Sequence, residues 1–310
     1  MTAQLNMHGL FDRTLTLPDT DARDRLNRLV GIDDKIKRLS NVLSVLINPA
    51  GLKSWLGKHH VDGAHLLDAV LRRPPLVVLC GDVGSGKTEL AETIGDQVAR
   101  QEKIDITLLP LSLSSRGQGR VGEMTQLITA AFEYAFAEAT KCKPNKGAAH
   151  GGVILLVDEA DALAQSRESD QMHHEDRAGV NAFIRGIDRL SSANLPVAVV
   201  MCTNRLGALD PAVRRRAADI LVFSRPDDAQ REEVLVRRLG PIGFGRTDIR
   251  ALVAATGVRS NRAYGYTYSD LTQRLLPAIV LDAYPAGPIK PARAVELANF
   301  IEPTPPFKDA

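Results

Sequence analysis

The chain has 310 residues, a formal net charge of +2 and only three cysteines, and these figures already exclude several classes of protein. With 44% hydrophobic and 25% charged residues, its composition is that of a folded globular protein. No stretch reaches the roughly 18 apolar residues of a membrane span, and the first residues lack the apolar core of a signal peptide. The near balance of 39 basic and 37 acidic side chains does not give the general positive charge of a nucleic-acid-binding protein. We therefore expect a cytoplasmic protein with no membrane partner.

Five short apolar runs alternate with longer helical patterns. Continuous apolar runs of this length predict strands that are buried on both faces, as in a parallel sheet. The strand runs are residues 76–80, 106–111, 153–157, 197–202 and 219–223, and the helical patterns between them cover residues 88–100, 124–140 and 178–190. The alternation predicts an α/β fold with a doubly wound parallel sheet.

After residue 223 only helical patterns are found. They cover residues 228–239, 248–256, 268–282 and 291–300. A small all-helical domain is therefore expected to follow the α/β domain, and the proline-rich end of the chain is expected to be loose or extended. Residues 1–20 are also expected to be unanchored. The predicted limits are 1–28 for an amino-terminal tail, 29–224 for the large domain, 225–301 for the small domain and 302–310 for a carboxyl-terminal tail.

The strongest motif is a glycine-rich loop that directly follows the first predicted strand. Residues 81–88 (GDVGSGKT) match GxxxxGK[ST], between a strand pattern and a helix pattern, which is the context that a phosphate-binding loop requires. Glycines let backbone N–H groups surround phosphates, and the helix N-terminus adds partial positive charge. We expect Lys87 to contact the β/γ-phosphates and the Thr88 hydroxyl to bind Mg²⁺. The remaining predicted nucleotide contacts in the loop are Asp82, Val83, Gly84, Ser85 and Gly86.

An acidic pair follows the third predicted strand. Asp158 and Glu159 come directly after residues 153–157. Because the carboxyl ends of parallel strands meet at one edge of a sheet, Asp158 is expected to bind the Mg²⁺ held by Thr88. Glu159 can then polarise an attacking water as general base. The alternative is that the acidic residues only begin the next helix, a role that Asp161 can fill.

Two further elements follow the fourth predicted strand. Asn204 is expected to hold the lytic water or to sense the γ-phosphate through its amide, although asparagine also favours turns. Arg214, Arg215 and Arg216 follow an LDPA run, and such permanently charged groups seldom lie in a core. They form either a solvated, anion-binding face or a source of a transition-state arginine for a neighbouring subunit, for which Arg215 and Arg216 are the predicted residues.

In this order the motifs resemble those of the AAA+ ATPases. Residues 29–35 (LVGIDDK) are similar to the family's segment beside the adenine, which implies that Val30, Gly31 and Ile32 contact the base. Residues 264–271 (YGYTYSDL) resemble the GxSGxDL lid motif of the AAA clade. The resemblance implies ATP and Mg²⁺ as cofactors and a ring, usually a homohexamer, with ATP bound between subunits. Other branches of the family place a sensor arginine at the start of the helix that follows this lid motif. We assign no residue of this chain to that role.

Within the family, the chain is most similar to the pachytene-checkpoint ATPases. Residues 113–116, 117–122, 180–188 and 216–220 carry this resemblance. It implies a HORMA-domain protein as client, remodelled by pulling through the ring pore, and a role in bacterial cyclic-nucleotide anti-phage signalling. The implied pore loop lacks the aromatic residue usual in the family, so its predicted gripping residues are Arg116, Gly117, Gln118 and Arg120.

A nucleic-acid-dependent AAA+ ATPase, of the helicase-loader or transposition type, is the alternative function. Its support is the arginine cluster at residues 214–216, Arg116 and Arg120 in the implied pore loop, and a pI of about 8.4. Against it are the near-neutral net charge and the lack of an added helix-turn-helix pattern. A protein client is therefore favoured over nucleic acid.

Overall fold

The structure is a computed structural model that describes residues 10–11, 13–60, 62–113, 122–143, 147–164, 174–205, 209–260 and 262–307. The predicted pore-loop residues Arg116, Gly117, Gln118 and Arg120 lie outside the described residues. The chain divides into two compact units. The larger comprises Met1–Arg28, Asp34–Cys80 and Thr88–Val222, and the smaller comprises Leu29–Asp33, Gly81–Lys87 and Phe223–Ala310. The limits proposed above for the domains remain predictions.

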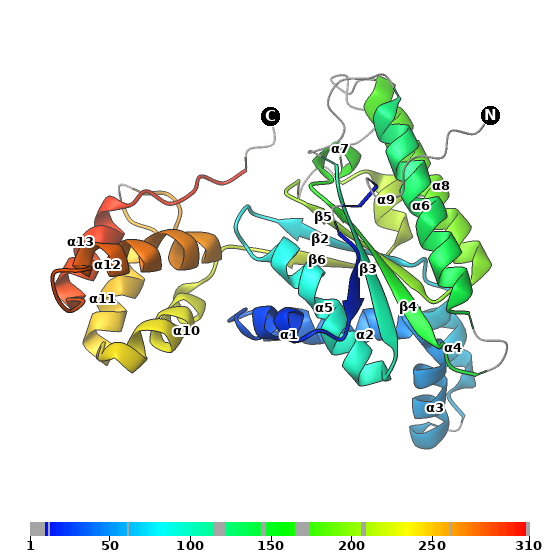
Figure 1. Ribbon diagram of the computed structural model, residues 1–310, viewed down its shortest axis with the longest axis horizontal. Coiled ribbons are helices and arrows are strands. Elements are labelled where there is room, and N and C mark those ends of the chain that lie inside the picture. Colours follow the sequence, from blue (N-terminus) through cyan, green and yellow to red (C-terminus); the bar gives the residue numbers. More distant parts are fainter. Residues whose placement is uncertain are drawn as a thin grey trace. The chain divides into compact units, whose positions relative to one another are not determined.

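A six-stranded sheet with the order β1-β3-β4-β5-β2-β6 forms the centre of the larger unit (Figure 1). The strands β2 (Leu76–Gly81), β3 (Asp105–Ser112), β4 (Gly151–Asp158) and β5 (Val197–Thr203) pair in parallel, and β6 (Ala217–Phe223) lies at one edge. Every residue of β2 and β5 is buried. The five predicted strands and the α/β class are therefore confirmed, although the edge strand β6 is only partly buried instead of buried on both faces.

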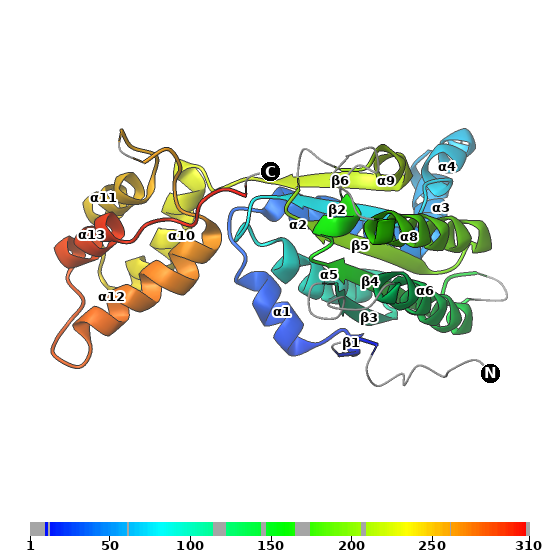
Figure 2. The same ribbon diagram turned by 90° about the horizontal axis from the view of Figure 1, so that it is seen from above.

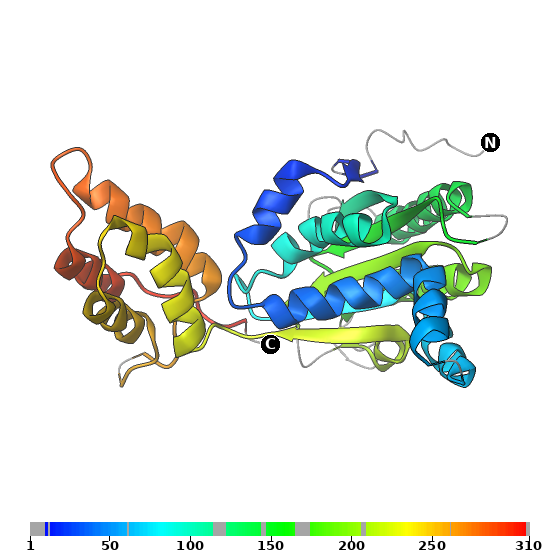
Figure 3. The same ribbon diagram turned by 90° about the horizontal axis from the view of Figure 1, so that it is seen from below.

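Helices cover both faces of this sheet (Figures 2 and 3). On one face, α6 (Glu123–Lys141) and α8 (His174–Ala193) form a core with alternate strand residues, and the rings of Phe132 and Phe183 meet edge to face with centroids 5.5 Å apart. Aromatic pairs favour this geometry. The predicted helices over residues 124–140 and 178–190 are confirmed.

The opposite face is covered by α2 (Asp33–Ile47) and α5 (Lys87–Glu102). A Cβ added at Gly152 of β4 would lie 2.3 Å from the Ile47 side chain, so α2 contacts the strand backbone closely. A Cβ added at Gly95 of α5 would lie 2.5 Å from Leu17. Small residues thus let both helices approach the sheet.

The expectation that residues 1–20 are unanchored is wrong for the part that the structure describes. Leu10 and Phe11 are buried, and β1 (Leu15–Leu17) adds an antiparallel strand beside β3. The Asp19 side chain then caps α1 (Thr20–Asn27) by accepting a 2.9 Å hydrogen bond from the Ala22 N–H. A three-residue strand and a mostly polar helix give no long apolar pattern, so sequence periodicity does not reveal them.

Four shorter helices complete the larger unit among the described residues. They are α3 (Pro49–His59), α4 (Ala64–Leu71), α7 (Asp161–Ala164) and α9 (Pro211–Arg216). None of the described helices combines the length and the apolar character that crossing a membrane requires.

The smaller unit is a helical bundle with its own apolar core. Tyr266 and Leu271 are fully buried in it. Its elements are α10 (Asp228–Leu239), the 3-10 turn η2 (Gly240–Ile242), α11 (Arg246–Thr256), the π-helical segment η3 (Asp270–Leu275), α12 (Leu276–Ala283) and α13 (Pro291–Phe300). All helical patterns predicted after residue 223 are therefore confirmed.

Residues 302–307 have no regular secondary structure, as predicted, but they are not loose. Pro303 is buried. The Thr304 N–H and hydroxyl donate to the two carboxylate oxygens of Asp270 at 3.0 and 2.7 Å. Three prolines exclude a helix here without preventing side-chain and backbone contacts to the bundle.

Candidate functional site

The phosphate loop joins β2 to α5, and its shape depends on glycine. Gly81, Gly84 and Gly86 have φ angles of 141°, 68° and 92°, which side-chain-bearing residues rarely adopt. A Cβ added at Gly81 would lie only 1.9 Å from the Phe223 carbonyl oxygen. The resulting curled backbone is the kind of cradle that phosphates occupy. The shape of the loop therefore fits the predicted nucleotide.

Lys87 and Thr88 begin α5 at the end of this loop. Lys87 is buried, and its Nζ donates to the carbonyl oxygens of Gly81 and Asp82 at 3.1 and 2.7 Å. Its ammonium group is therefore held within the phosphate loop. Such a lysine is the usual phosphate contact of this motif.

In the larger unit, Thr88 lies beside the carboxyl end of β4. Its Oγ1 donates to Asp158 Oδ1 at 3.3 Å. Burial raises the pKa of the Asp158 carboxyl above its usual value, although the hydrogen bonds that it accepts from the Glu159 N–H and from Thr88 act to lower it. A hydroxyl beside a carboxylate supplies the oxygen ligands that Mg²⁺ takes together with nucleotide phosphates. Thr88 and Asp158 therefore fit the predicted metal.

Glu159 has an unusual backbone conformation. Its φ is 53°, in the left-handed region, and its side chain is exposed. Its N–H donates to Asp158 Oδ1 at 2.9 Å. A non-glycine residue in this region costs on the order of 1–3 kcal/mol, and such residues cluster at functional sites. The conformation supports the prediction that Glu159 acts on a substrate water.

Asp161 organises the end of β5, a role that its sequence position did not reveal. Its Oδ1 accepts hydrogen bonds from the Thr203 hydroxyl and the Asn204 N–H, each at 2.7 Å. Its Oδ2 accepts from Asn204 Nδ2 at 3.2 Å. Asp161 therefore fixes the orientation of the Asn204 amide, and it is also the acidic residue in the first turn of α7. The only sequence feature that could have indicated this role is that Asp161 is a third acidic residue, two positions after Glu159.

The predicted adenine segment is held by the smaller unit. Val30 and Ile32 are buried, and Gly31 has a φ of 75°. The Gly31 carbonyl oxygen accepts from Gln230 Nε2 at 2.7 Å and from the Tyr268 hydroxyl at 3.4 Å. Gln230 and Tyr268 thus position this segment. Neither contact was predicted, although Tyr268 lies in the lid motif, because both partners are distant from Gly31 along the chain.

The lid motif lies directly on the phosphate loop. The Ser269 N–H donates to the Gly84 carbonyl oxygen at 3.0 Å. A Cβ added at Gly84 would lie 2.8 Å from Thr267 Oγ1. Asp270, fully buried, accepts from the Thr267 N–H at 3.0 Å and from Arg274 Nη1 at 2.9 Å. The motif therefore binds the loop through its small polar residues, and Arg274 is paired with Asp270.

Asp270→Asn should destabilise the protein by about 3 kcal/mol at neutral pH, because it removes the charged partner of a buried pair. Burial opposes ionisation of Asp270, but hydrogen bonds from Thr267, Thr304 and Arg274 together lower the pKa of its carboxyl. A lowered folded-state pKa gives stability that is present above about pH 3.9 and is lost as the pH falls through the folded value. Urea unfolding from about pH 7 to about pH 3 should therefore show the difference between wild type and variant shrinking below about pH 4. A difference independent of pH would contradict this assignment.

The three consecutive arginines differ in their surroundings. Arg216 Nε and Nη2 donate to the carboxylate of Asp188 at 2.7 and 2.9 Å, and its Nη1 donates to the Ala212 carbonyl oxygen at 3.2 Å. Arg214 and Arg215 are exposed, and no hydrogen bond or ion pair of their side chains is found within the described part of the chain. Of the two arginines predicted to act on a neighbour, Arg215 is therefore available and Arg216 is bound within its own subunit.

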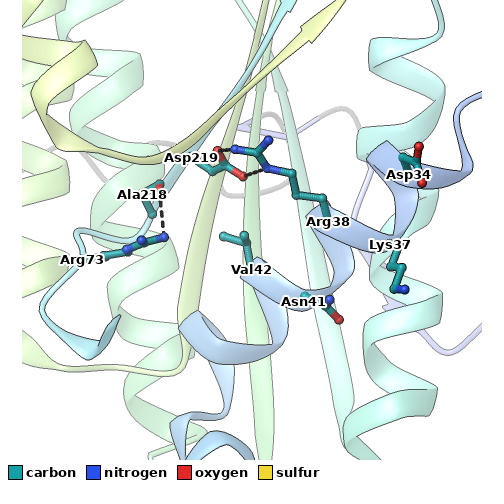
Figure 4. A pocket seen from close by; sticks show the side chains of 8 residues that line it. All are labelled: Asp34, Lys37, Arg38, Asn41, Val42, Arg73, Ala218 and Asp219. Carbon is teal, nitrogen blue, oxygen red and sulfur yellow. Dashed lines mark hydrogen bonds and ion pairs between the residues drawn. The ribbon is translucent and has the colours of Figure 1, made fainter. Parts of the chain in front are cut away.

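The segment after these arginines is anchored at the edge of the sheet (Figure 4). Arg38 of α2 donates from Nε and Nη2 to the two oxygens of Asp219 at 2.6 and 2.5 Å. Arg73, just before β2, donates to the Ala218 carbonyl oxygen at 3.3 Å. These bonds fix the start of β6, and they position the end of α9 that carries Arg214 and Arg215.

Comparisons with known proteins show the family to which the chain belongs. The model of the ATPase family associated with various cellular activities (AAA) matches residues 77–225. CD-NTase-associated protein 6 of Escherichia coli (strain MS 115-1) is 58% identical over 309 residues, covering 100% of this chain and 99% of that protein. A chain in the structure of the E. coli MS115-1 HORMA:CdnC:Trip13 complex matches with a TM-score of 0.88 at 58% identity, covering 96% of this chain and 97% of that one. Rhizobiales Trip13 matches with a TM-score of 0.76 at 55% identity over 96% of this chain and 100% of that one. With relatives this similar along its whole length, the chain belongs to the AAA family of ATPases.

Proposed function

We propose that this protein is a ring-forming ATPase that uses ATP hydrolysis to remodel or disassemble a HORMA-domain protein and thereby regulates a cyclic-nucleotide anti-phage signalling system. The observation that carries the proposal is the 58% identity, along nearly the whole chain, with a protein solved in a complex with HORMA and CdnC. We place this activity in the cytoplasm.

Each residue of the candidate site has a role in this reaction. Lys87 and the backbone of residues 82–86 would bind the phosphates, and Val30, Gly31 and Ile32 would contact the adenine. Thr88 and Asp158 would hold Mg²⁺, which neutralises phosphate charge when bound. Glu159 takes the proton of the attacking water, and Asn204, oriented by Asp161, positions that water.

The active assembly in this proposal is a homohexameric ring. The exposure of Arg214 and Arg215 supports it, because a guanidinium must be accessible to reach a neighbour's nucleotide. An arginine supplied by another subunit makes hydrolysis depend on assembly.

The proposal is tested with the HORMA and CdnC proteins of the E. coli MS115-1 complex. In the presence of ATP, substoichiometric amounts of this protein should separate HORMA from CdnC, measured by size-exclusion chromatography, and should stop cyclic-nucleotide synthesis. ADP, or the Glu159→Gln variant with ATP, should not. A HORMA:CdnC complex that persists despite measurable ATP turnover would contradict the proposal, and an ATPase rate raised by DNA or RNA rather than by HORMA would support the alternative function.

A further inference from the structure

Asp82 places a negative charge in the loop that is to bind phosphates. Its Oδ2 accepts a hydrogen bond from Arg225 Nε at 2.6 Å, and its Oδ1 accepts one from the Val83 N–H at 2.8 Å. The side chains of Arg225 and Asp82 are only 14% and 17% exposed. In such a weakly hydrated position an uncompensated carboxylate would repel a phosphate group strongly. Arg225 therefore neutralises a charge that would otherwise oppose nucleotide binding.

The remaining nitrogens of Arg225 connect two other segments to the loop. Nη1 donates to the Gly265 carbonyl oxygen at 2.7 Å, and Nη2 donates to the Thr304 carbonyl oxygen at 2.7 Å. The guanidinium also lies over the ring of Tyr264, with its Cζ 4.9 Å from the ring centroid. A planar guanidinium with several fixed donors suits such a junction better than a lysine ammonium would.

Residues 302–307, which we call the carboxyl-terminal strap, are held from their other side by the lid motif. Thr304 donates from its N–H and its hydroxyl to Asp270, and Asp270 accepts from the Thr267 N–H. Thr267 in turn lies against Gly84 of the phosphate loop. Arg225 therefore connects the phosphate loop to the strap, the strap is bound to the lid motif, and the lid motif contacts the loop again. All of these contacts lie within the smaller unit.

We propose that Arg225 is a positioning residue for the nucleotide: it neutralises the opposing charge of Asp82 and, through Thr304, makes the carboxyl-terminal strap part of the support of the phosphate loop. This inference rests on the proposed ATPase function, because it assigns a cause of nucleotide affinity at the same site. It also accounts for an acidic residue at a position in the loop where its charge alone would be unfavourable.

The charge part of the proposal is tested by equilibrium titration with a fluorescent ADP analogue. Arg225→Gln should weaken binding about 30-fold, because the Asp82 carboxylate then faces the diphosphate uncompensated. Adding Asp82→Asn to that variant should restore affinity to within about threefold of wild type, because the unpaired charge is removed. A double variant as weak as Arg225→Gln alone would overturn charge neutralisation, since a purely structural loss is not repaired by a second substitution.

The role of the strap is tested by asking whether substitutions of Thr304 and Arg225 affect ADP binding independently of each other. Thr304→Val removes the hydroxyl bonded to Asp270 at nearly constant shape and should weaken ADP binding about fivefold in the wild-type background, but less than twofold when Arg225 is already Gln. Effects that simply add would overturn the connection through the strap. Arg293→Gln is the matched control, because Arg293 pairs with Asp282 and Glu296 elsewhere in the smaller unit, and it should leave the affinity unchanged. If wild type itself fails to bind ADP, the proposed function fails instead, and thermal unfolding of each variant identifies any that does not fold.

Discussion

Replacing Glu159 by Gln should leave ATP binding close to wild type and slow hydrolysis by about 10³-fold, because a positioned general base contributes roughly 10²–10⁴ to such a reaction. Gln has the shape of Glu but cannot take a proton from water at neutral pH. The backbone at this position is already in the left-handed region, with a φ of 53°, and Gln tolerates it as Glu does. The variant therefore changes the chemistry of the side chain without changing the fold.

Phosphate release and binding of a fluorescent ATP analogue, measured on the same preparation, check this result. Asp158→Asn provides the contrast: it removes the carboxylate that accepts the Thr88 hydroxyl bond, so Mg²⁺-dependent ATP binding should weaken as well as turnover. Glu133→Gln is a matched control on α6, where the Glu133 side chain is 63% exposed, and it should be indistinguishable from wild type. Undiminished turnover by Glu159→Gln would remove Glu159 as the base.

The strands and the phosphate loop were predictable because their signals are local. The apolar run of β2 is buried on both faces, and such runs are typical of strands in a parallel sheet whatever the rest of the chain does. The loop follows from a motif of eight consecutive residues whose glycines adopt the required backbone. By contrast, β1 has three residues, too few for any periodicity to appear.

The contacts that complete the site were not predictable, because they join residues far apart in the chain. Arg225 and Asp82 are 143 positions apart, and Gln230 and Gly31 are 199 apart. Arg225 lies just before the helix predicted over residues 228–239, and the sequence around it does not indicate which acidic residue it pairs with. The strap was expected to be loose or extended for a similar reason, because its prolines exclude a helix. Sequence alone does not show that the Thr304 carbonyl oxygen accepts a hydrogen bond from Arg225 or that its hydroxyl donates one to Asp270.

Arg215→Ala should bind ATP normally and lose hydrolysis by about 10³-fold, which is the effect of removing an arginine that stabilises transferring phosphate charge. Arg216→Ala should behave differently. Its ion pair with Asp188 is partly exposed, with side chains 29% and 51% accessible, so its loss should cost less than about 1 kcal/mol of stability. Its effect on hydrolysis should be smaller than that of Arg215→Ala, because it supports the end of α9 within its own subunit. Phosphate release by both variants, with Arg214→Ala as the third comparison, identifies which arginine hydrolysis requires.

Mixing subunits tests whether Arg215 acts between them. Lys87→Ala subunits lack ATP binding but retain Arg215, whereas Arg215→Ala subunits bind ATP but lack the arginine. In a ring built head to tail from equal amounts of both, about a quarter of the interfaces place a competent nucleotide site against an intact Arg215. Hydrolysis should therefore reappear on mixing, although each variant alone is inactive. Mixed rings that form but stay inactive would contradict action between subunits. Arg237→Ala is the control: it removes an exposed arginine of α10 that lies 3.7 Å from Glu233, and it should be active both alone and in mixtures. Recovery specific to Arg215 would show that hydrolysis requires this exposed arginine from the neighbouring subunit.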